Sequence, residues 1–420
     1  MLRLRLPLRY AVLLFLFLIP ACAQTLTPVW VELAPEGATL ARVIIETGAR
    51  CPDLRADGHA LAMQVRQPVP EGFKPACQAT IPAGTRSLRW GRKKLKLPRT
   101  PDRVMVIGDT GCRVKGTALQ PCDDPNLWPF ARISAQIARA KPDLIVHVGD
   151  YLYREDVCPA MVNGCGGPHG DNWPTWNADF FTPVREALTA APWLFARGNH
   201  EDCERSFRGW FYYLDPRPYP DACESYTESY VAKAGDLRLG VLDSSETKDP
   251  PGKKPEQIDI YTGKLNELSN RADWLVDHHP FWAYNSQKKT ISVDPQTLGP
   301  AWLKAAPQAF SLVLSGHIHL FEFVELETPR LRQVIAGDGG TQLLTGIETA
   351  GQGTAAGAIA KTGEVNLSFG WTELVRTRDG WSLTLRSVAG APQIECRLPA
   401  SAPSTCEVIS QKQRSSVPER

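Results

Sequence analysis

Five apolar, strand-like segments of this 420-residue chain end in residues that can bind a metal ion. The endings are Gly108-Asp109, Gly149-Asp150, Gly198-Asn199-His200, His278-His279 and Gly316-His317-Ile318-His319. A single Gly-Asp ending would be an ordinary turn, but five such endings in one region are hard to explain as turns. Ligands of α/β proteins bind beyond the carboxyl ends of strands, so we expect these side chains to meet at one site.

The side chains at these endings are suited to first-row metal ions. Asp and Asn offer oxygen donors and His offers an imidazole nitrogen, a mixture that suits iron, zinc and manganese. The expected ligands are Asp109, Asp150, Asn199, His279, His317 and His319. This set is larger than one tetrahedral ion requires, so we expect two ions with one carboxylate bridging them.

The order of these motifs along the chain resembles that of a known family. GDTG, GDYLY, GNHE, VDHH and GHIH, spread over about residues 101–345, are similar to the five blocks of the calcineurin-like metallophosphoesterases. The second block, with Tyr153 three residues after Asp150, resembles that of the purple acid phosphatase branch. The resemblance implies an α/β (α+β) fold, a four-layer αββα sandwich with a dinuclear metal site between the strand ends.

The resemblance also implies a role for each residue. Asp109, Tyr153 and His319 would bind the first metal, Asp150 would bridge, and Asn199, His279 and His317 would bind the second. Because Tyr153 would bind as a phenolate, the first ion would be Fe(III), with Fe, Zn or Mn in the second site. His200 would not bind metal and would lie near the leaving group as an acid or electrostatic stabiliser.

The activity that the resemblance implies is hydrolysis of small phosphate monoesters, of the acid phosphatase type, by attack of a metal-bound hydroxide. A phosphodiesterase or nucleotidase on the same fold is an alternative. A non-catalytic surface binding protein is a further one, although the intact ligand set argues against it. The segment 281–290 has no His where several purple acid phosphatases have substrate-contacting histidines, and Lys288 and Lys289 could meet phosphate there instead.

Other residues have simpler interpretations. We expect His147, inside an apolar run, to be a hydrogen-bonded core histidine, and His59 and His169 to be outside the site. We expect His278 to support its neighbour His279 from outside the ligand set. The glycine-rich segment 337–340 is either a tight turn or a close approach to the metal site.

The elements that must position these residues change along the chain. Short β-type runs over residues 24–100 predict a small all-β N-terminal domain. Alternating strand-like and helix-like runs, the latter at 128–140 and 181–191, predict a catalytic domain over residues 101–388. Residues 154–176 predict a long loop, and residues 389–420 a C-terminal tail with a possible disulfide.

The N-terminus and the cysteines indicate export. Residues 1–23 have the basic start, apolar centre and small-residue cleavage site of a signal peptide, although Cys22 is alternatively a lipid anchor. The other ten of eleven cysteines fall into five short sequential pairs, which favour disulfides without fixing their connectivity. These pairs are Cys51/Cys77, Cys112/Cys122, Cys158/Cys165, Cys203/Cys223 and Cys396/Cys406. No C-x2-C spacing supports a zinc cluster.

Composition predicts neither a nucleic-acid nor a membrane-spanning protein. Removing Arg3, Arg5 and Arg9 with the signal peptide leaves 44 of 47 basic residues against 45 acidic ones, a net charge of −1. This balance predicts no nucleic-acid partner, and no later segment is apolar and long enough to span a bilayer. We therefore expect a secreted or periplasmic protein, or a lipoprotein if Cys22 carries an anchor.

Overall fold

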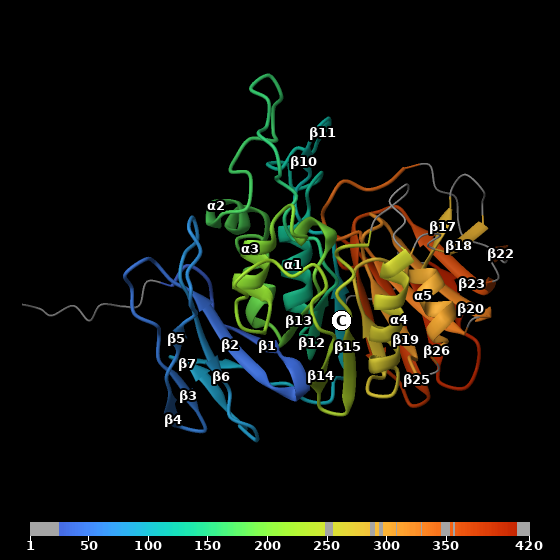
Figure 1. Cartoon of the computed structure of the whole chain (residues 1–420), viewed down its shortest axis with the longest axis horizontal. Helices are drawn as coiled ribbons and strands as arrows, with labels where there is room; N and C mark the ends of the chain where they lie inside the picture. Colours follow the sequence, from blue (N-terminus) through green and yellow to red (C-terminus); the bar gives the residue numbers. More distant parts are fainter. Residues whose placement is uncertain are drawn as a thin grey trace, which may run out of the picture.

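The computed structural model describes residues 25–247, 255–285, 290–293, 297–307, 309–328, 330–345, 353–355 and 358–409. Two large sheets form its centre, with helices on their outer faces (Figure 1). The predicted signal peptide, Cys22 and the pair Lys288 and Lys289 lie outside the described residues. The mixed α/β architecture with an N-terminal β region agrees with the predicted fold class.

The larger sheet has 11 strands in the order β27-β26-β25-β24-β9-β12-β13-β1-β2-β6-β5. At its centre, β9 pairs in parallel with β12, and β12 pairs in parallel with β13. The strands are β1 (Trp30–Leu33), β2 (Thr39–Ile44), β5 (Gln64–Val65), β6 (Ala76–Thr80), β9 (Arg103–Ile107), β12 (Leu144–His147), β13 (Trp193–Phe195), β24 (Gly370–Arg376), β25 (Gly380–Ser387), β26 (Pro392–Pro399) and β27 (Thr405–Val408). The central strands are apolar and buried along most of their length, as expected for strands that are covered on both faces.

The second sheet has 8 strands in the order β14-β15-β16-β19-β21-β20-β23-β22. Here β15, β16, β19 and β21 run parallel to one another. The strands are β14 (Tyr230–Ala234), β15 (Leu237–Val241), β16 (Trp274–Val276), β19 (Leu312–Ser315), β20 (Phe321–Thr328), β21 (Leu331–Ala336), β22 (Gly353–Ala355) and β23 (Ala358–Asn366). Both sheets therefore carry short parallel strands whose carboxyl ends can supply ligands.

The two sheets pack face to face through alternate side chains of their central strands. Val104 and Val106 of the larger sheet share one buried cluster with Trp274, Val276 and other residues of the second sheet. Met105, between the two valines, faces the opposite side and packs with α1. This alternation is the period of two that a strand buried on both faces must show.

Helices cover the outer faces of both sheets. On the larger sheet lie α1 (Phe130–Arg139), α2 (Trp173–Trp176) and α3 (Phe207–Gly209), with the short π-helices Asn177–Phe181 and Trp210–Leu214 and the 3-10 helix Ala187–Thr189. On the second sheet lie α4 (Pro255–Ser269) and α5 (Leu298–Ala305). Aromatic residues fill the layer under α1 and α2, where Tyr151 stacks on Trp176 and Trp210.

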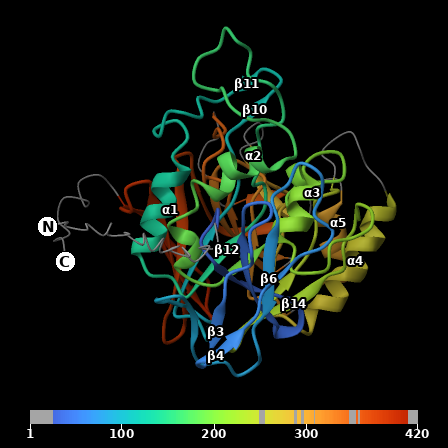
Figure 2. The same cartoon turned by 90° about the vertical axis from the view of Figure 1, so that its left-hand side faces the viewer.

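The N-terminal region contributes to two sheets. Strands β3 (Leu54–Ala56), β4 (His59–Leu61), β7 (Leu88–Trp90) and β8 (Lys93–Leu95) form a separate 4-stranded sheet. In contrast, β1, β2, β5 and β6 extend the larger sheet, and β1 pairs in parallel with β13 at Glu32 and Trp193. This region, drawn in blue, lies at the left of Figure 1 and faces the viewer in Figure 2. Whether residues 24–100 fold as an independent domain stays a prediction.

Three local predictions differ in outcome. The helix predicted over 128–140 is confirmed as α1. The helix predicted over 181–191 is confirmed only in part, because a 3-10 helix forms at Ala187–Thr189 while Pro183 lacks the N–H that a continuous helix interior needs. The tail predicted from residue 389 is wrong over its first part, where β26 and β27 pair at the edge of the larger sheet. Alternating Ile394, Cys396 and Leu398 are buried there, a strand pattern hidden by the polar composition.

Five disulfides connect the five predicted sequential pairs. Such bonds form and persist in oxidising compartments, so they suggest an extracellular location. Among the described residues, no helix has the length and apolar character needed to cross a bilayer.

A further small hairpin, β10 (Val114–Lys115) and β11 (Ala118–Leu119), lies between Cys112 and Cys122 and projects at the top of Figures 1 and 2. A second hairpin, β17 (Trp282–Asn285) and β18 (Thr290–Val293), follows β16.

Candidate metal centre

The five predicted strand endings meet between the two sheets. Asp109, Asp150 and Asn199 follow β9, β12 and β13, which are neighbours in the larger sheet. His278 and His317 follow β16 and β19, which are neighbours in the facing sheet. Because both sets of parallel strands end on the same side, residues more than 200 positions apart come into contact, as in the bond from His317 N to Asp109 Oδ2 (3.0 Å).

The backbone at these endings is sharply turned. Asp109, Asp150 and His317 have φ values of 53°, 60° and 70°, a left-handed conformation that costs about 1–2 kcal/mol for a residue with a side chain. The preceding glycines are required by close packing. A Cβ on Gly198 would lie 2.1 Å from Asp150 Oδ1, and one on Gly316 would lie 2.6 Å from Asp109 Oδ2. Strain of this kind is typical of functional sites.

A first group of buried side chains lies around Tyr153. Ligand atoms of Asp109, Asp150 and His319 all lie within 4.8 Å of one another. The Tyr153 hydroxyl points into this group, 2.5 Å from Asp150 Oδ2, 3.0 Å from Asp109 Oδ1 and 2.8 Å from His319 Nε2. The structure thus brings together the four side chains predicted to surround the first metal ion.

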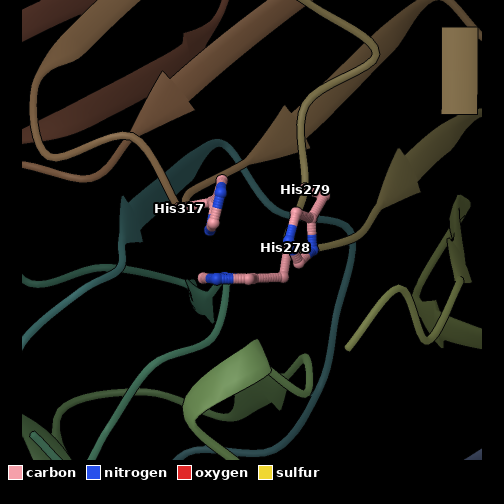
Figure 3. A group of neighbouring side chains, drawn as sticks. All are labelled: His278, His279 and His317. Carbon is pink, nitrogen blue, oxygen red and sulfur yellow. The ribbon is translucent and has the colours of Figure 1, made fainter. Parts of the chain in front are cut away.

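A second group contains three histidines. Ligand atoms of His278, His279 and His317 lie within 4.8 Å of one another, and Figure 3 shows two of these side chains leaving one loop while His317 approaches from another. Asn199 Oδ1 lies 2.9 Å from His278 Nε2 and 3.0 Å from His317 Nδ1. Asp150 Oδ2 lies 3.2 Å from His278 Nε2, so this carboxylate faces both groups.

The geometry does not agree with the expectation that His278 stays outside the ligand set. Its Nδ1 lies 2.8 Å from the carbonyl oxygen of Val148 and must donate there, which leaves Nε2 as the nitrogen that faces Asn199 and Asp150. His279 also reaches the site, and its Nδ1 is buried without a hydrogen-bond partner. A usable sequence signal existed: Val276 faces the other sheet, and the strand period of two puts His278 on that same side.

A sequence model of one family matches the part of the chain that carries these residues. The model describes calcineurin-like phosphoesterases and matches residues 102–321. The chain belongs to the calcineurin-like phosphoesterase family. The family predicted from the five motifs is therefore confirmed.

Solved structures support the same fold for this calcineurin-like phosphoesterase. Purple acid phosphatase PPD1 from seeds of yellow lupin (Lupinus luteus) is similar, with 13% identity, a TM-score of 0.52, and coverage of 94% of this chain and 76% of that one. PhoD is also similar, with 13% identity, a TM-score of 0.50, and coverage of 90% and 88%. At these identities the likeness concerns the fold alone. No curated protein sequence matches this chain.

The charges of this phosphoesterase site fit bound cations. Burial, together with the nearby Asp150 charge, raises the pKa of Asp109 to about 8. Burial opposes ionisation of Asp150 as well, but His278 and His200 outweigh it and hold the pKa of that carboxyl well below its usual value. Burial also disfavours protonation of His278, yet Asp150 raises the pKa of this imidazole to about 10. Positive charge is therefore favoured between the carboxylates, where two metal ions would supply it.

Glu201 supports the site from behind and was not predicted. Its carboxylate accepts hydrogen bonds from the backbone N–H groups of Asp150 (3.0 Å), Tyr151 (2.9 Å), Leu152 (3.2 Å) and Gly198 (3.1 Å). It thereby ties the ending of β12 to the ending of β13. Burial, with Asp150 nearby, raises the pKa of Glu201 to about 8. Glu201 is the last residue of the GNHE motif, so the motif was a sequence signal from which its role beside the site could have been predicted.

His200 lies at the edge of the first group. Its ring centroid is 3.8 Å from that of Tyr153, and its Nε2 is 3.9 Å from Asp150 Oδ2. On its other side, Nδ1 contacts the Glu155 carboxylate, which also pairs with Lys115 at 2.6 Å. Burial lowers the pKa of His200, although Asp150 and Glu155 oppose this shift.

A cavity of about 360 Å³ opens onto both groups of metal-binding side chains. Its lining includes Asp150, Tyr153, Asn199, His200, His317 and His319. Three cationic side chains, Arg113, Lys115 and Arg205, complete it together with Ile318 and Leu344. These cations were not singled out from the sequence, because they belong to no motif and come together only through folding.

The remaining predictions concern residues near the site. His147 is buried, lies 3.0 Å from Thr110 Oγ1 and stacks on Tyr151, so it is the predicted core histidine. His59 and His169 are exposed, as expected. The segment 337–340 approaches the site closely: a Cβ on Gly337 would lie 2.1 Å from Ile318 O and 3.2 Å from Asp109 Oδ2. The close-approach interpretation of this segment is thus correct.

Proposed function

We propose that this chain is an exported, dinuclear metal-dependent phosphoesterase that hydrolyses phosphate monoesters, as acid phosphatases do. The observation that carries the proposal is the position of Asp150, whose Oδ2 lies 2.5 Å from the Tyr153 hydroxyl and 3.2 Å from His278 Nε2. One carboxylate facing two groups of donors is suited to bridge two ions.

On this proposal, Asp109, Tyr153 and His319 hold the first ion, and Asn199, His278, His279 and His317 surround the second. The metal pair would polarise the phosphate and lower the pKa of water. The phenol oxygen of Tyr153 is a hard donor that favours Fe(III) in the first site, with Fe, Zn or Mn in the second. Side chains of both groups that would hold the ions line the cavity, which supports a small phosphorylated substrate as the partner.

The other polar side chains have separate tasks in the proposed reaction. His200 lines the cavity beside Asp150 and Tyr153, where it can hold or donate a proton to the leaving oxygen. Glu155 contacts its Nδ1 and so orients the ring. Glu201 keeps Asp150 in place through four backbone N–H groups.

Export is supported by the disulfides and by the signal-like residues 1–23, which lie outside the described structure. Cleavage after residue 23 would give a secreted or periplasmic protein, whereas lipidation of Cys22 would give an anchored one. N-terminal mass analysis of the exported protein distinguishes these forms.

A substrate panel tests the proposed activity. The full mature chain, loaded with iron and with zinc or manganese, is assayed with p-nitrophenyl phosphate and bis(p-nitrophenyl) phosphate, with Asp150→Asn as the inactive control. We expect a higher kcat/KM for the monoester. A higher value for the diester would assign a phosphodiesterase, and no hydrolysis of either ester by protein containing two metals would support a non-catalytic binding protein.

A further inference from the structure

We infer that the cavity beside the metal centre selects phosphate esters that carry a second anionic group, such as a second phosphate or a carboxylate. Arg113 is the main residue that would recognise this group, with Arg205 and Lys115 beside it. The inference rests on the proposed phosphoesterase function and specifies its substrate class.

Arg113 is held firmly close to the metal centre. It follows Cys112, which is bonded to Cys122, and it precedes β10. Its backbone N–H donates to Gln120 Oε1 at 2.9 Å, and its carbonyl oxygen accepts from Gln120 N at 2.8 Å. Gln120 in turn donates to Gly340 O at 2.9 Å, in the glycine-rich segment that packs on the site. These bonds fix the backbone from which the Arg113 side chain extends, so only side-chain freedom remains to be lost when the guanidinium meets a ligand.

The guanidinium of Arg113 lies one imidazole ring away from the metal-binding side chains. Its Nη1 is 3.4 Å from Nδ1 of His319, whereas Nε2 on the other side of that ring lies 2.8 Å from the Tyr153 hydroxyl. Arg113 is therefore displaced from the place where two metals would hold the reacting phosphate. A group bound by Arg113 would be a different part of the substrate.

The positive charge of Arg113 has no carboxylate partner among the described residues. Within that part of the chain its guanidinium contacts the His319 ring and forms no ion pair, and its Nε is buried without a hydrogen-bond partner. Arg205 differs in having a long ion pair, 3.9 Å from its Nε to Asp202 Oδ2, but its Nη1 is buried without a hydrogen-bond partner. Lys115, in contrast, is already paired with Glu155 at 2.6 Å.

The composition of the cavity lining indicates what this charge would bind. Two metal ions would already neutralise much of the charge on one phosphate, so the additional cations are not required for a neutral leaving group. An arginine fork binds phosphate or carboxylate through two parallel hydrogen bonds, which are stronger than neutral ones. Ile318 and Leu344 add apolar surface for a short carbon skeleton between the two anions.

Three esters with the same carbon chain length test the inference on the metal-loaded full chain. They are butyl phosphate, 4-phosphooxybutanoate and butane-1,4-diol bisphosphate. We expect kcat/KM to be about tenfold or more higher for the two substrates with a second anion, mainly through a lower KM, because a charge-assisted hydrogen bond to this anion stabilises the bound substrate. The carboxylate and bisphosphate arms distinguish which second anion is preferred.

Variants assign the preference to Arg113. In Arg113→Gln we expect the ratio of kcat/KM between bisphosphate and butyl phosphate to fall toward one, and Arg113→Lys should restore part of it. Arg139→Gln, which removes an exposed positive charge at the end of α1, is the matched control and should keep the wild-type ratio. Circular dichroism checks that each variant is folded.

Two results would overturn the inference: a ratio near one in the wild type, or an unchanged ratio in folded Arg113→Gln. Failure of the proposed function gives a different result, namely no hydrolysis of any ester. In that case calorimetric binding of the same three compounds still tests the preference, since equal affinities would refute it and tighter binding of the two doubly anionic compounds would support it.

Discussion

The hydroxyl of Tyr153 lies 2.5 Å from Oδ2 of Asp150, three residues earlier in the chain. Both side chains are buried, and burial together with the two nearby aspartates raises the pKa of Tyr153 well above its usual value. Without a cation this phenol would stay protonated and donate to the carboxylate. A trivalent ion between the two residues would instead favour the phenolate.

Replacing Tyr153 by Phe should remove the colour of the iron-loaded protein. A phenolate bound to Fe(III) gives a broad visible charge-transfer band, so the oxidised, iron-replete wild type should be purple and Tyr153→Phe colourless. Much of the hydrolysis should remain, because the phenol would tune a metal and would not touch phosphorus. The wild type and Tyr153→Phe are compared by visible absorption spectra and by metal analysis of the same samples.

Tyr151 supplies the matched control for this experiment. It is buried two residues earlier, but its hydroxyl donates to the carbonyl oxygen of Ala196 at 2.8 Å and lies outside the two metal-binding groups. Tyr151→Phe should keep the band. A wild-type protein that is active, contains iron and is colourless when oxidised would make Tyr153 a packing residue.

Asp150→Asn should reduce metal content more than Asp109→Asn does. Asp150 faces both groups of donors, whereas Asp109 faces only the first. The asparagine can still accept the hydrogen bond from His200 N (2.9 Å), so the change mainly removes charge. After dialysis, we expect Asp150→Asn to keep well under one ion per chain and Asp109→Asn about one. Elemental analysis that finds two ions in Asp150→Asn would exclude the bridging role.

His278→Ala should weaken the second site more than His279→Ala does. Nε2 of His278 faces Asn199 and Asp150 directly, while the His279 ring packs at a tilt against His317 with centroids 4.0 Å apart. We expect about a hundredfold or greater loss of affinity for the second ion in His278→Ala, and a smaller loss of about tenfold in His279→Ala. Titration with a competing chelator measures both. If His278→Ala binds the second ion with the same affinity as the wild type, His279 and not His278 is the ligand.

The sequence predicted those parts of the site that depend on strand endings. A run such as Val104–Ile107 followed by Gly-Asp specifies both a buried strand and the turn that follows, so the positions of Asp109 and Asp150 could be anticipated. The short cysteine pairs were also predictable, because close partners have the lowest cost of loop closure.

Features that depend on contacts between distant segments could not be predicted in this way. The addition of β1 to the larger sheet depends on its pairing with β13, far along the chain. Arg113 and Arg205 come from separate loops and meet only at the completed cavity. None of these relationships leaves a periodic signal in the sequence.

Glu32 should make stability depend on pH far from the metal centre. This buried carboxylate of β1 lies 3.3 Å from Arg42 Nη1, yet burial outweighs the guanidinium and raises the pKa of Glu32 from 4.5 to about 7. The pKa of Glu32 is higher in the folded state than in the unfolded state. Its contribution to the free energy of unfolding is therefore fully present below about pH 4.5 and is lost as the pH rises to about 7. The loss should be on the order of 3 kcal/mol in the free energy of unfolding.

Urea denaturation at pH 4.5 and 7 should therefore show a smaller decrease for Glu32→Gln than for the wild type, whereas Glu71→Gln, an exposed control, should follow the wild type. The same decrease in Glu32→Gln and the wild type would mean that folding does not raise the pKa of Glu32.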